Sequence, residues 1–308
     1  MDVILHVGAH RTASSAAQRL LERGAGAARA RGVEVWTPRQ TRAGLLSGVL
    51  GDPSRDDPRR DALAHRAAGR IAMRRAALTR EGATRLVISE ENLLGGLREN
   101  AALAKLYPSA RARLARAARA LPGLAELHLA IRSPDMWWTS AFAFLITRGA
   151  PPPSDDAIDA VARARRGWRQ VVEDAAAAMP QARLVVWSYE GAGRPEAVAN
   201  RLTGLRLPPL RAAIAASPSA TALEARLAAE GWPATLPRVG DVWAPFPPDL
   251  RATLRDRYAE DVEWLASGAD GLAEWVPGRS GADLPGTRGR RHGRRRHARS
   301  AQGLGAPG

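Results

Sequence analysis

The sequence predicts an α/β fold: a P-loop-like three-layer sandwich with a mainly parallel central sheet of about five strands and helices on both faces. Short runs rich in β-branched residues recur along the chain, and a longer stretch with a helical pattern separates each run from the next. Strands that alternate with helices in this way pair in parallel through right-handed crossovers. The first strand also leads directly into a turn of small residues and a helix start, which is typical of sheets that bind an anion.

The composition is that of a globular protein without cysteine chemistry. Of the 308 residues, 45% are hydrophobic and 25% are charged, and cysteine is absent. Disulfides, thiolate nucleophiles and cysteine-bound metals are therefore excluded. The chain enters a strand almost at once, and no stretch approaches the roughly 20 apolar residues of a membrane span. We therefore expect a cytoplasmic protein that does not cross a membrane.

The end of the chain differs from the rest in composition. Residues 279–308 hold Asp283 as their only acidic residue and eight arginines, which are Arg279, Arg288, Arg290, Arg291, Arg294, Arg295, Arg296 and Arg299. Too few large apolar residues are present to offset the entropy of ordering, so 278–308 is predicted to be a disordered tail. It carries about half of the net charge of +15 and can bind anions or nucleic acid without specificity. Residues 1–277 are predicted to form one α/β domain.

The first fifteen residues carry the strongest functional signal. Val3 to Val7 has the pattern of a buried strand, Gly8 ends it, and a helical pattern begins at Ser14 with a possible stop at Gly24. Such a turn directs free backbone N–H groups and the positive end of the helix dipole at the occupant of the loop. The loop therefore predicts a phosphate or sulfate site. The alternative of a plain turn, in which a hydroxyl only caps the helix, stays open.

Neither common phosphate-loop pattern matches this stretch. Gly8 has no second glycine at the Walker A spacing, no lysine follows, and G-x-G-x-x-G is absent. The segment Arg11-Thr12-Ala13-Ser14-Ser15 instead resembles, position by position, the Lys-Thr-Gly-Thr-Thr loop of the sulfotransferase family. Several bacterial members of that family also place a glycine and a histidine just before the loop, where Gly8 and His10 stand here.

The resemblance implies that these five residues bind the 5′-phosphosulfate of 3′-phosphoadenosine 5′-phosphosulfate (PAPS). Two positions depart from the family pattern, because Arg11 replaces lysine and Ala13 replaces glycine. Lys105 is the only lysine of the chain, so arginine has replaced lysine almost everywhere. Arginine is a planar fork and lysine a point charge, and an alanine at a position that requires a positive φ would be strained.

Two further strands are predicted at residues 33–36 and 85–89. Between them lie a loop region rich in glycine and proline at 38–60, with one short helical piece, and a helix at 61–80. In the family that the chain resembles, segments near 38–60 help to shape the acceptor pocket.

Two adjacent carboxylates, Glu90 and Glu91, follow the strand at 85–89. They stand at the carboxyl end of a strand, where open α/β sheets bind ligands. Sulfotransferases use a glutamate or a histidine to take the proton from the acceptor hydroxyl. The resemblance therefore implies Glu90 as the catalytic base, with Glu91 and then His10 as the next candidates. The alternative is that one carboxylate caps the following turn or pairs with an arginine.

A second informative stretch follows the strand predicted at 126–131, which comes after a helix predicted at 105–121. Arg132 ends the strand, Pro134 stands where proline favours a helix start, and Ser140 lies two turns into that helix. Sulfotransferases carry an arginine and a serine at this separation, and both bind the 3′-phosphate of PAPS. The resemblance implies the same role for Arg132 and Ser140, with the arginine as a permanently charged clamp.

Three further side chains in this region have two readings each. Trp137 and Trp138 either flank the adenine of a nucleotide or pack in the core. His128 alternates with apolar neighbours and is interpreted as a structural histidine rather than a ligand.

The C-terminal half continues the alternation of helices and strands. We expect a strand at 184–187 and helices at 155–179, 195–202, 222–230 and 248–265. Residues 236–243 loosely resemble the late Arg-x-Gly loop of the sulfotransferases, which folds over the cofactor. The resemblance makes Arg238 and Gly240 the counterparts of that motif.

Taken with the resemblance, the sequence predicts an enzyme that transfers a sulfuryl group from PAPS to a hydroxyl or amine of a carbohydrate or small-molecule acceptor. Arg11 would neutralise charge on the leaving oxygen, and no metal is expected. Three alternatives stay open: a nucleotide-binding protein without turnover, a kinase-like phosphoryl transferase, and a nucleic-acid binder that acts through its tail.

Overall fold

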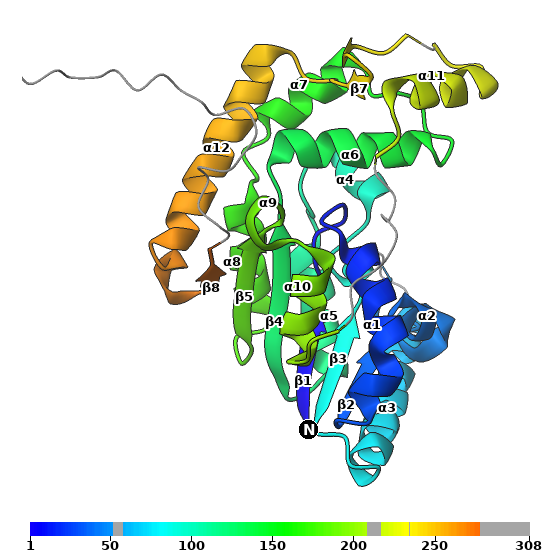
Figure 1. Cartoon of the computed structure of the whole chain (residues 1–308), viewed down its shortest axis with the longest axis vertical. Helices are drawn as coiled ribbons and strands as arrows, with labels where there is room; N and C mark the ends of the chain where they lie inside the picture. The colour runs from blue at the N-terminus through cyan, green and yellow to red at the C-terminus, as the bar shows by residue number, and fades with distance from the viewer. Residues whose placement is uncertain (52–57, 208–216, 234, 278–308) are drawn as a thin grey trace, which may run out of the picture.

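The computed structural model describes residues 1–51, 58–207, 217–233 and 235–277 (Figure 1), and the predicted tail lies outside these residues. Six strands form one parallel sheet in the order β2-β3-β1-β4-β5-β8. Their bounds are β1 Asp2–His6, β2 Val33–Trp36, β3 Arg85–Ser89, β4 Leu124–Ile131, β5 Arg183–Ser188 and β8 Glu274–Val276. The predicted parallel α/β sheet is confirmed, and β8 adds one strand to the expected five.

Helices cover both faces of the sheet because the strand residues alternate between two apolar sides. On one face, Ile4 and Val87 pack in a cluster with residues of α1 (Ser14–Arg29) and α10 (Pro195–Thr203). On the other face, Val3 and Leu5 belong to a larger cluster. The helices that pack there are α3 (Pro58–Arg80), α5 (Ala110–Ala120), α8 (Trp168–Ala178) and α12 (Pro248–Ala266). The arrangement is a three-layer sandwich.

Several elements lie beyond the carboxyl ends of the strands, where α6 (Pro134–Ile146) crosses above the sheet in Figure 1. The remaining helices near this end are α4 Leu97–Leu103, α7 Asp155–Arg163, α9 Tyr189–Ala192 and α11 Ala220–Ala229, with a hairpin of β6 Arg238–Val239 and β7 Val242–Trp243. Short turns complete the fold, at α2 Pro38–Gln40, η1 Thr41–Leu45, η2 Glu91–Leu93 and η3 Ala269–Gly271. None of the described helices combines the length and apolar character required to cross a bilayer.

Helix boundaries are where the sequence predictions were wrong. The first helix does not stop at Gly24, because it continues to Arg29, and a Cβ at Gly24 would lie only 2.8 Å from a methyl carbon of Leu207. That glycine therefore serves close packing rather than helix termination. The helix predicted at 155–179 is two helices, α7 and α8, separated by four residues that end at Gly167.

The helix predicted at 105–121 begins only at Ala110, and the preceding helix α4 was not predicted. Its C-cap residue Ala104 has φ 48°, and Tyr107 has φ 44°, so the chain leaves the helical region twice between α4 and α5. Nothing in the residue types of this stretch signals a left-handed conformation, which glycine and asparagine normally take.

Candidate anion-binding site

The loop between β1 and α1, residues 8–15 (loop 8–15), has a backbone shape imposed by close contacts and positive φ angles. Gly8 has φ 36°, and a Cβ there would lie 2.4 Å from Ser14 Oγ. Arg11 has φ 64° and Ala13 has φ 63°. Ala13 therefore takes the left-handed conformation that a glycine would adopt without strain. The alanine that replaces the glycine of the family pattern is therefore strained at this position.

Five consecutive backbone N–H groups of loop 8–15, from Arg11 to Ser15, donate to no acceptor within the described part of the chain. The first N–H groups of a helix have no partner inside the helix, and left-handed residues turn neighbouring N–H groups toward a common concavity. The helix dipole adds positive potential at the same point. This geometry favours an anion.

The hydroxyls of the loop fasten its backbone. Thr12 Oγ1 donates to the carbonyl of Ala9 at 2.6 Å, and Ser14 Oγ donates to the same oxygen at 3.3 Å. Ser15 is exposed. The N-cap of α1 is Ala13, which has no side chain able to cap, so the alternative of a capping hydroxyl does not apply.

Two arginines and one serine converge on the loop. The Arg11 Nε–H donates to Ser140 Oγ at 2.9 Å, and Arg132 Nη1 donates to the backbone oxygen of Arg11 at 2.9 Å. Burial and the neighbouring charge of Arg132 lower the pKa of Arg11. Among the described residues, neither arginine forms an ion pair with a carboxylate. The structure thus brings together Arg11, Arg132 and Ser140, which are 129 positions apart at most.

Aromatic rings complete the arginine side of the site. The Arg132 guanidinium lies 4.7 Å from the centre of the Tyr189 ring, and the Arg11 guanidinium lies 5.5 Å from that of Phe144. Such stacking orients a guanidinium without neutralising it. Trp137 and Trp138 are buried, so they pack in the core.

Glu90 lies at the same end of the sheet but is fully engaged. Its side chain is buried, and its Oε2 accepts from Thr41 Oγ1 at 2.5 Å. The Arg42 Nη2 donates to Oε1 at 2.7 Å, and the backbone N–H of Asn92 donates to the same oxygen at 3.1 Å. Glu90 therefore both caps the turn η2 and pairs with an arginine, as the alternative reading proposed.

Glu91 is the more accessible of the two carboxylates. It accepts from Gln18 Nε2 at 2.7 Å and from Arg42 Nη2 at 2.9 Å, and 12% of its side chain is exposed. Burial alone would raise the pKa of Glu91, but the attraction of a protonated His10, the hydrogen bond from Gln18 and the charge of Arg42 outweigh burial and lower it. Glu91 is thus an ionised carboxylate of low basicity.

His10 is held on both ring nitrogens. Its Nδ1 lies 3.0 Å from the Tyr107 hydroxyl and its Nε2 lies 3.1 Å from Asn92 Oδ1. Asn92 Oδ1 can only accept, so this arrangement places the proton on Nε2 and leaves Nδ1 to accept from Tyr107. Burial lowers the pKa of His10, which keeps the ring neutral.

Arg238 is apart from the other predicted residues. It lies on the β6–β7 hairpin, exposed, where its Nη1 is 3.3 Å from Glu224 Oε2 and 3.5 Å from Thr221 Oγ1. Within the described residues no contact joins it to loop 8–15. The structure therefore groups Arg238 with α11 and not with the anion site.

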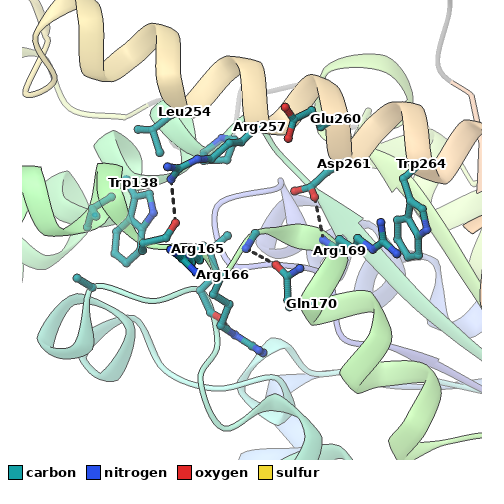
Figure 2. Close-up of a pocket in the computed structure, with 16 residues that line it drawn as sticks. Trp138, Arg165, Arg166, Arg169, Gln170, Leu254, Arg257, Glu260, Asp261 and Trp264 are labelled. Carbon is teal, nitrogen blue, oxygen red and sulfur yellow. Dashed lines mark hydrogen bonds between the residues drawn. The ribbon is translucent and has the colours of Figure 1, made fainter.

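A separate cavity of about 280 Å³ lies between α6, α12 and the α7–α8 connection (Figure 2). Arg165, Arg166 and Arg257 line it, together with the ring of Trp138. Asp261 closes one side by accepting from the backbone N–H of Trp168 at 2.8 Å (Figure 2 labels Asp261). Neither loop 8–15 nor Arg132 or Ser140 lines this cavity.

Arg42 and Tyr107, whose hydrogen bonds position the candidate site residues, were not identified from the sequence. Arg42 links Glu90 to Glu91, and Tyr107 contacts both the backbone and the ring of His10. Arg42 lies in a glycine-rich loop region, where no sequence pattern distinguishes it from the other arginines. Tyr107 could have been singled out, because it is one of only three tyrosines in the chain. In the described part of the chain, no group of three or more His, Asp or Glu side chains is arranged to hold a metal ion.

The assembled site is a group of free N–H donors and two arginines at the carboxyl ends of β1 and β4, and the carboxylates Glu90 and Glu91 lie after β3. The fold shown by the sheet order is α/β with parallel strands. Comparison with protein-family models, with curated proteins and with solved structures gave no match to this chain.

Proposed function

We propose that this chain is a sulfotransferase that uses PAPS as its donor and a hydroxyl or amine of a carbohydrate or small molecule as its acceptor. The observation that supports the proposal best is the convergence of the free N–H groups of Arg11 to Ser15 with Arg11, Arg132 and Ser140. These are the residues that the resemblance implies for the two charged ends of PAPS.

Bound PAPS would supply the sulfuryl group and leave as adenosine 3′,5′-bisphosphate. The N–H groups of loop 8–15 and the Arg11 guanidinium would hold the 5′ end and stabilise negative charge on the oxygen that leaves sulfur. Arg132 and Ser140 would hold the 3′-phosphate, because an arginine offers paired donors to phosphate.

The acceptor proton needs a base, and the geometry favours Glu91 or His10 over Glu90. Both carboxylates accept hydrogen bonds at both oxygens, but Glu90 is fully buried. Glu91 is partly exposed, and His10 is a neutral imidazole beside it. A general base must come within hydrogen-bond reach of the proton it removes.

Binding is tested first, by isothermal titration calorimetry of the full chain with adenosine 3′,5′-bisphosphate. The controls are the 2′,5′ isomer, which has the same charge in a different arrangement, and ATP with magnesium, which is the donor of a kinase. Tight binding of the 3′,5′ isomer alone supports the proposal. Preference for ATP with magnesium would favour the kinase-like alternative instead, and equal binding of all three would leave only a non-specific anion site.

Transfer is tested second, with radiolabelled PAPS and a panel of hydroxyl and amine acceptors. Glu91→Gln and His10→Asn should each lower turnover while binding of the bisphosphate is retained. The proposal requires that the unmodified chain forms a sulfated product with at least one acceptor. If it binds the bisphosphate but forms no product with any acceptor, a nucleotide-binding protein without turnover is favoured.

The second candidate is a nucleotide-binding protein without turnover. Two observations favour it: Glu90 is locked by Arg42, and Ala13 occupies the position where the family has glycine. A nucleic-acid binder that acts through the tail is tested separately by deleting residues 279–308, which lie outside the described residues.

A further inference from the structure

The indole of Trp137 holds a backbone carbonyl of loop 8–15. Trp137 lies in the first turn of α6, is fully buried, and its Nε1–H donates to the carbonyl oxygen of His10 at 2.7 Å. A trans peptide unit is planar, with its C=O and N–H pointing in opposite directions. Because the carbonyl of His10 points at the indole, the N–H of Arg11 in the same peptide unit points away from the indole, and it has no acceptor in the described part of the chain.

The next peptide unit is held in the same way by Arg132. The Arg132 Nη1 donates to the carbonyl oxygen of Arg11 at 2.9 Å, so the N–H of Thr12 in that unit also faces away from its holder. The backbone of Arg132 is itself fixed, because the Trp168 Nε1–H donates to its carbonyl oxygen at 2.7 Å. Trp168 is fully buried, and Asp261 accepts from its backbone N–H at 2.8 Å.

The two tryptophans belong to one aromatic cluster. Their rings meet edge to face with centres 6.1 Å apart, and the buried ring of Tyr107 lies 5.7 Å from Trp137 and 6.2 Å from Trp168. Tyr107 also accepts from the backbone N–H of His10 at 2.8 Å. Close-packed rings of this size permit little movement, so the donors on them have fixed positions.

We propose that Trp137 and Trp168 are positioning residues of the anion site. Trp137 donates its indole N–H to the His10 carbonyl and so orients the N–H of Arg11 toward a bound anion. Trp168 fixes Arg132, which in turn holds the Arg11 carbonyl and so orients the N–H of Thr12. Arg11 has φ 64°, a conformation that an unrestrained arginine would leave. The inference rests on the anion site of the proposed function but not on sulfuryl transfer.

The test is Trp137→Phe, with Trp138→Phe as the matched control. Both tryptophans are buried on the same helix and their rings are in contact, 4.9 Å between centres, but Trp138 makes no hydrogen bond through its indole N–H among the described residues. Calorimetry with inorganic pyrophosphate and with adenosine 3′,5′-bisphosphate measures affinity, and thermal unfolding without ligand measures the structural effect.

We expect Trp137→Phe to weaken both ligands about tenfold relative to Trp138→Phe, at similar loss of thermal stability, since one hydrogen bond to a buried carbonyl is removed. Trp168→Phe should give a similar loss through Arg132. Equal affinities for the two α6 variants would overturn the proposal, because a purely structural role predicts the same effect at both positions.

A second variant separates the N–H group from the size of the ring. Benzothienylalanine at position 137 replaces the indole N–H by sulfur with little change in shape, and the same replacement at position 138 is its control. Weaker pyrophosphate binding only at position 137 supports the proposal, and equal binding at both contradicts it. These variants also serve if Trp137→Phe does not fold.

The outcomes also distinguish this inference from the proposed function. If the unmodified chain binds pyrophosphate but not the bisphosphate, the PAPS proposal fails while the positioning test proceeds with pyrophosphate. If it binds neither ligand, there is no anion for the tryptophans to serve, and both proposals fail.

Discussion

The two halves of the carboxyl edge of the sheet differ in how much of their hydrogen-bonding capacity is used. At the ends of β1 and β4, five N–H groups and two guanidinium groups face the site without a carboxylate partner in the described chain. At the end of β3, Glu90 and Glu91 accept from Thr41, Arg42 and Gln18. The donors at the ends of β1 and β4, here called the open half, can therefore accept an anion. The carboxylates at the end of β3, here called the closed half, are already paired with donors of the protein.

This difference shows that similar residue types can serve binding or structure depending on the partners that the fold supplies. Arginines without a carboxylate partner, placed beside free N–H groups, destabilise the folded protein unless an anion binds between them. Such an arrangement therefore indicates a binding role. A buried glutamate with every oxygen satisfied indicates a structural role. The predictions below test each half, from the largest expected effect to the smallest.

Glu90→Gln should lower the free energy of unfolding by about 3 kcal/mol, because it removes the charge of a buried carboxylate that accepts several hydrogen bonds and places an amide N–H₂ against the donors of Thr41 and the partly exposed Arg42. Urea denaturation measures the change. The control is Glu173→Gln, whose pair with Arg169 is exposed on both sides and is expected to contribute less than about 0.5 kcal/mol. A Glu90 variant of normal stability that binds but does not turn over would instead make the closed half catalytic.

Arg132→Ala should weaken binding of adenosine 3′,5′-bisphosphate about a hundredfold, because it removes a charged clamp and frees the carbonyl of Arg11. Arg165→Ala is the control, since Arg165 is exposed in the separate cavity and has no hydrogen-bond partner among the described residues. Calorimetry measures both. Equal effects of the two substitutions would show that the open half acts only through net charge.

The pH dependence of stability should report on His6, which is buried below loop 8–15 with its Nδ1 2.9 Å from Ser89 Oγ. Burial, and then the neighbouring His128, lower the pKa of His6 to about 3 from an ordinary 6.5. Between these values the unfolded chain binds a proton that the folded chain does not, so this contribution is complete above pH 6.5 and is lost as the pH falls.

The variant His6→Asn should therefore lose about 2 kcal/mol less of its unfolding free energy than the unmodified chain does between pH 7 and pH 5. Urea denaturation at the two pH values gives the comparison. The same loss in both proteins would show that His6 becomes protonated without unfolding.

Ala13→Gly should raise the free energy of unfolding by about 0.5 kcal/mol, because relief of the left-handed alanine exceeds the added entropy of the unfolded chain. Ala16→Gly, three residues later in the first turn of α1, is the control and should lower it by up to about 1 kcal/mol. Thermal unfolding compares them. Destabilisation by both substitutions would show that Ala13 is not strained.

The sequence predicted the elements that depend on local pattern. All five expected strands lie within two residues of their predicted bounds, and α6 begins at Pro134, where proline favours a helix start. The sequence did not predict helix boundaries that depend on contacts with residues far away in the chain. The break before α8 ends at Gly167, where a Cβ would lie 2.7 Å from the Asp261 carboxylate of α12 that caps the new helix.

The site shows the same limit. The residues of the anion site were selected through the resemblance to the sulfotransferase motifs, and the structure brings Arg11, Arg132 and Ser140 together. The state of Glu90 could not, since its partners Thr41 and Arg42 come from a loop region whose path no periodic pattern fixes. Likewise, the contact between Arg11 and Ser140 depends on how α6 crosses above the sheet.

That contact has a kinetic consequence. Arg11 and Ser140 bind each other here, yet under the proposed function they serve opposite ends of one nucleotide. If complete binding separates this pair after the first encounter, association is a two-step process. In stopped-flow measurements, the observed rate should level off at high nucleotide concentration, and Ser140→Ala should remove the plateau.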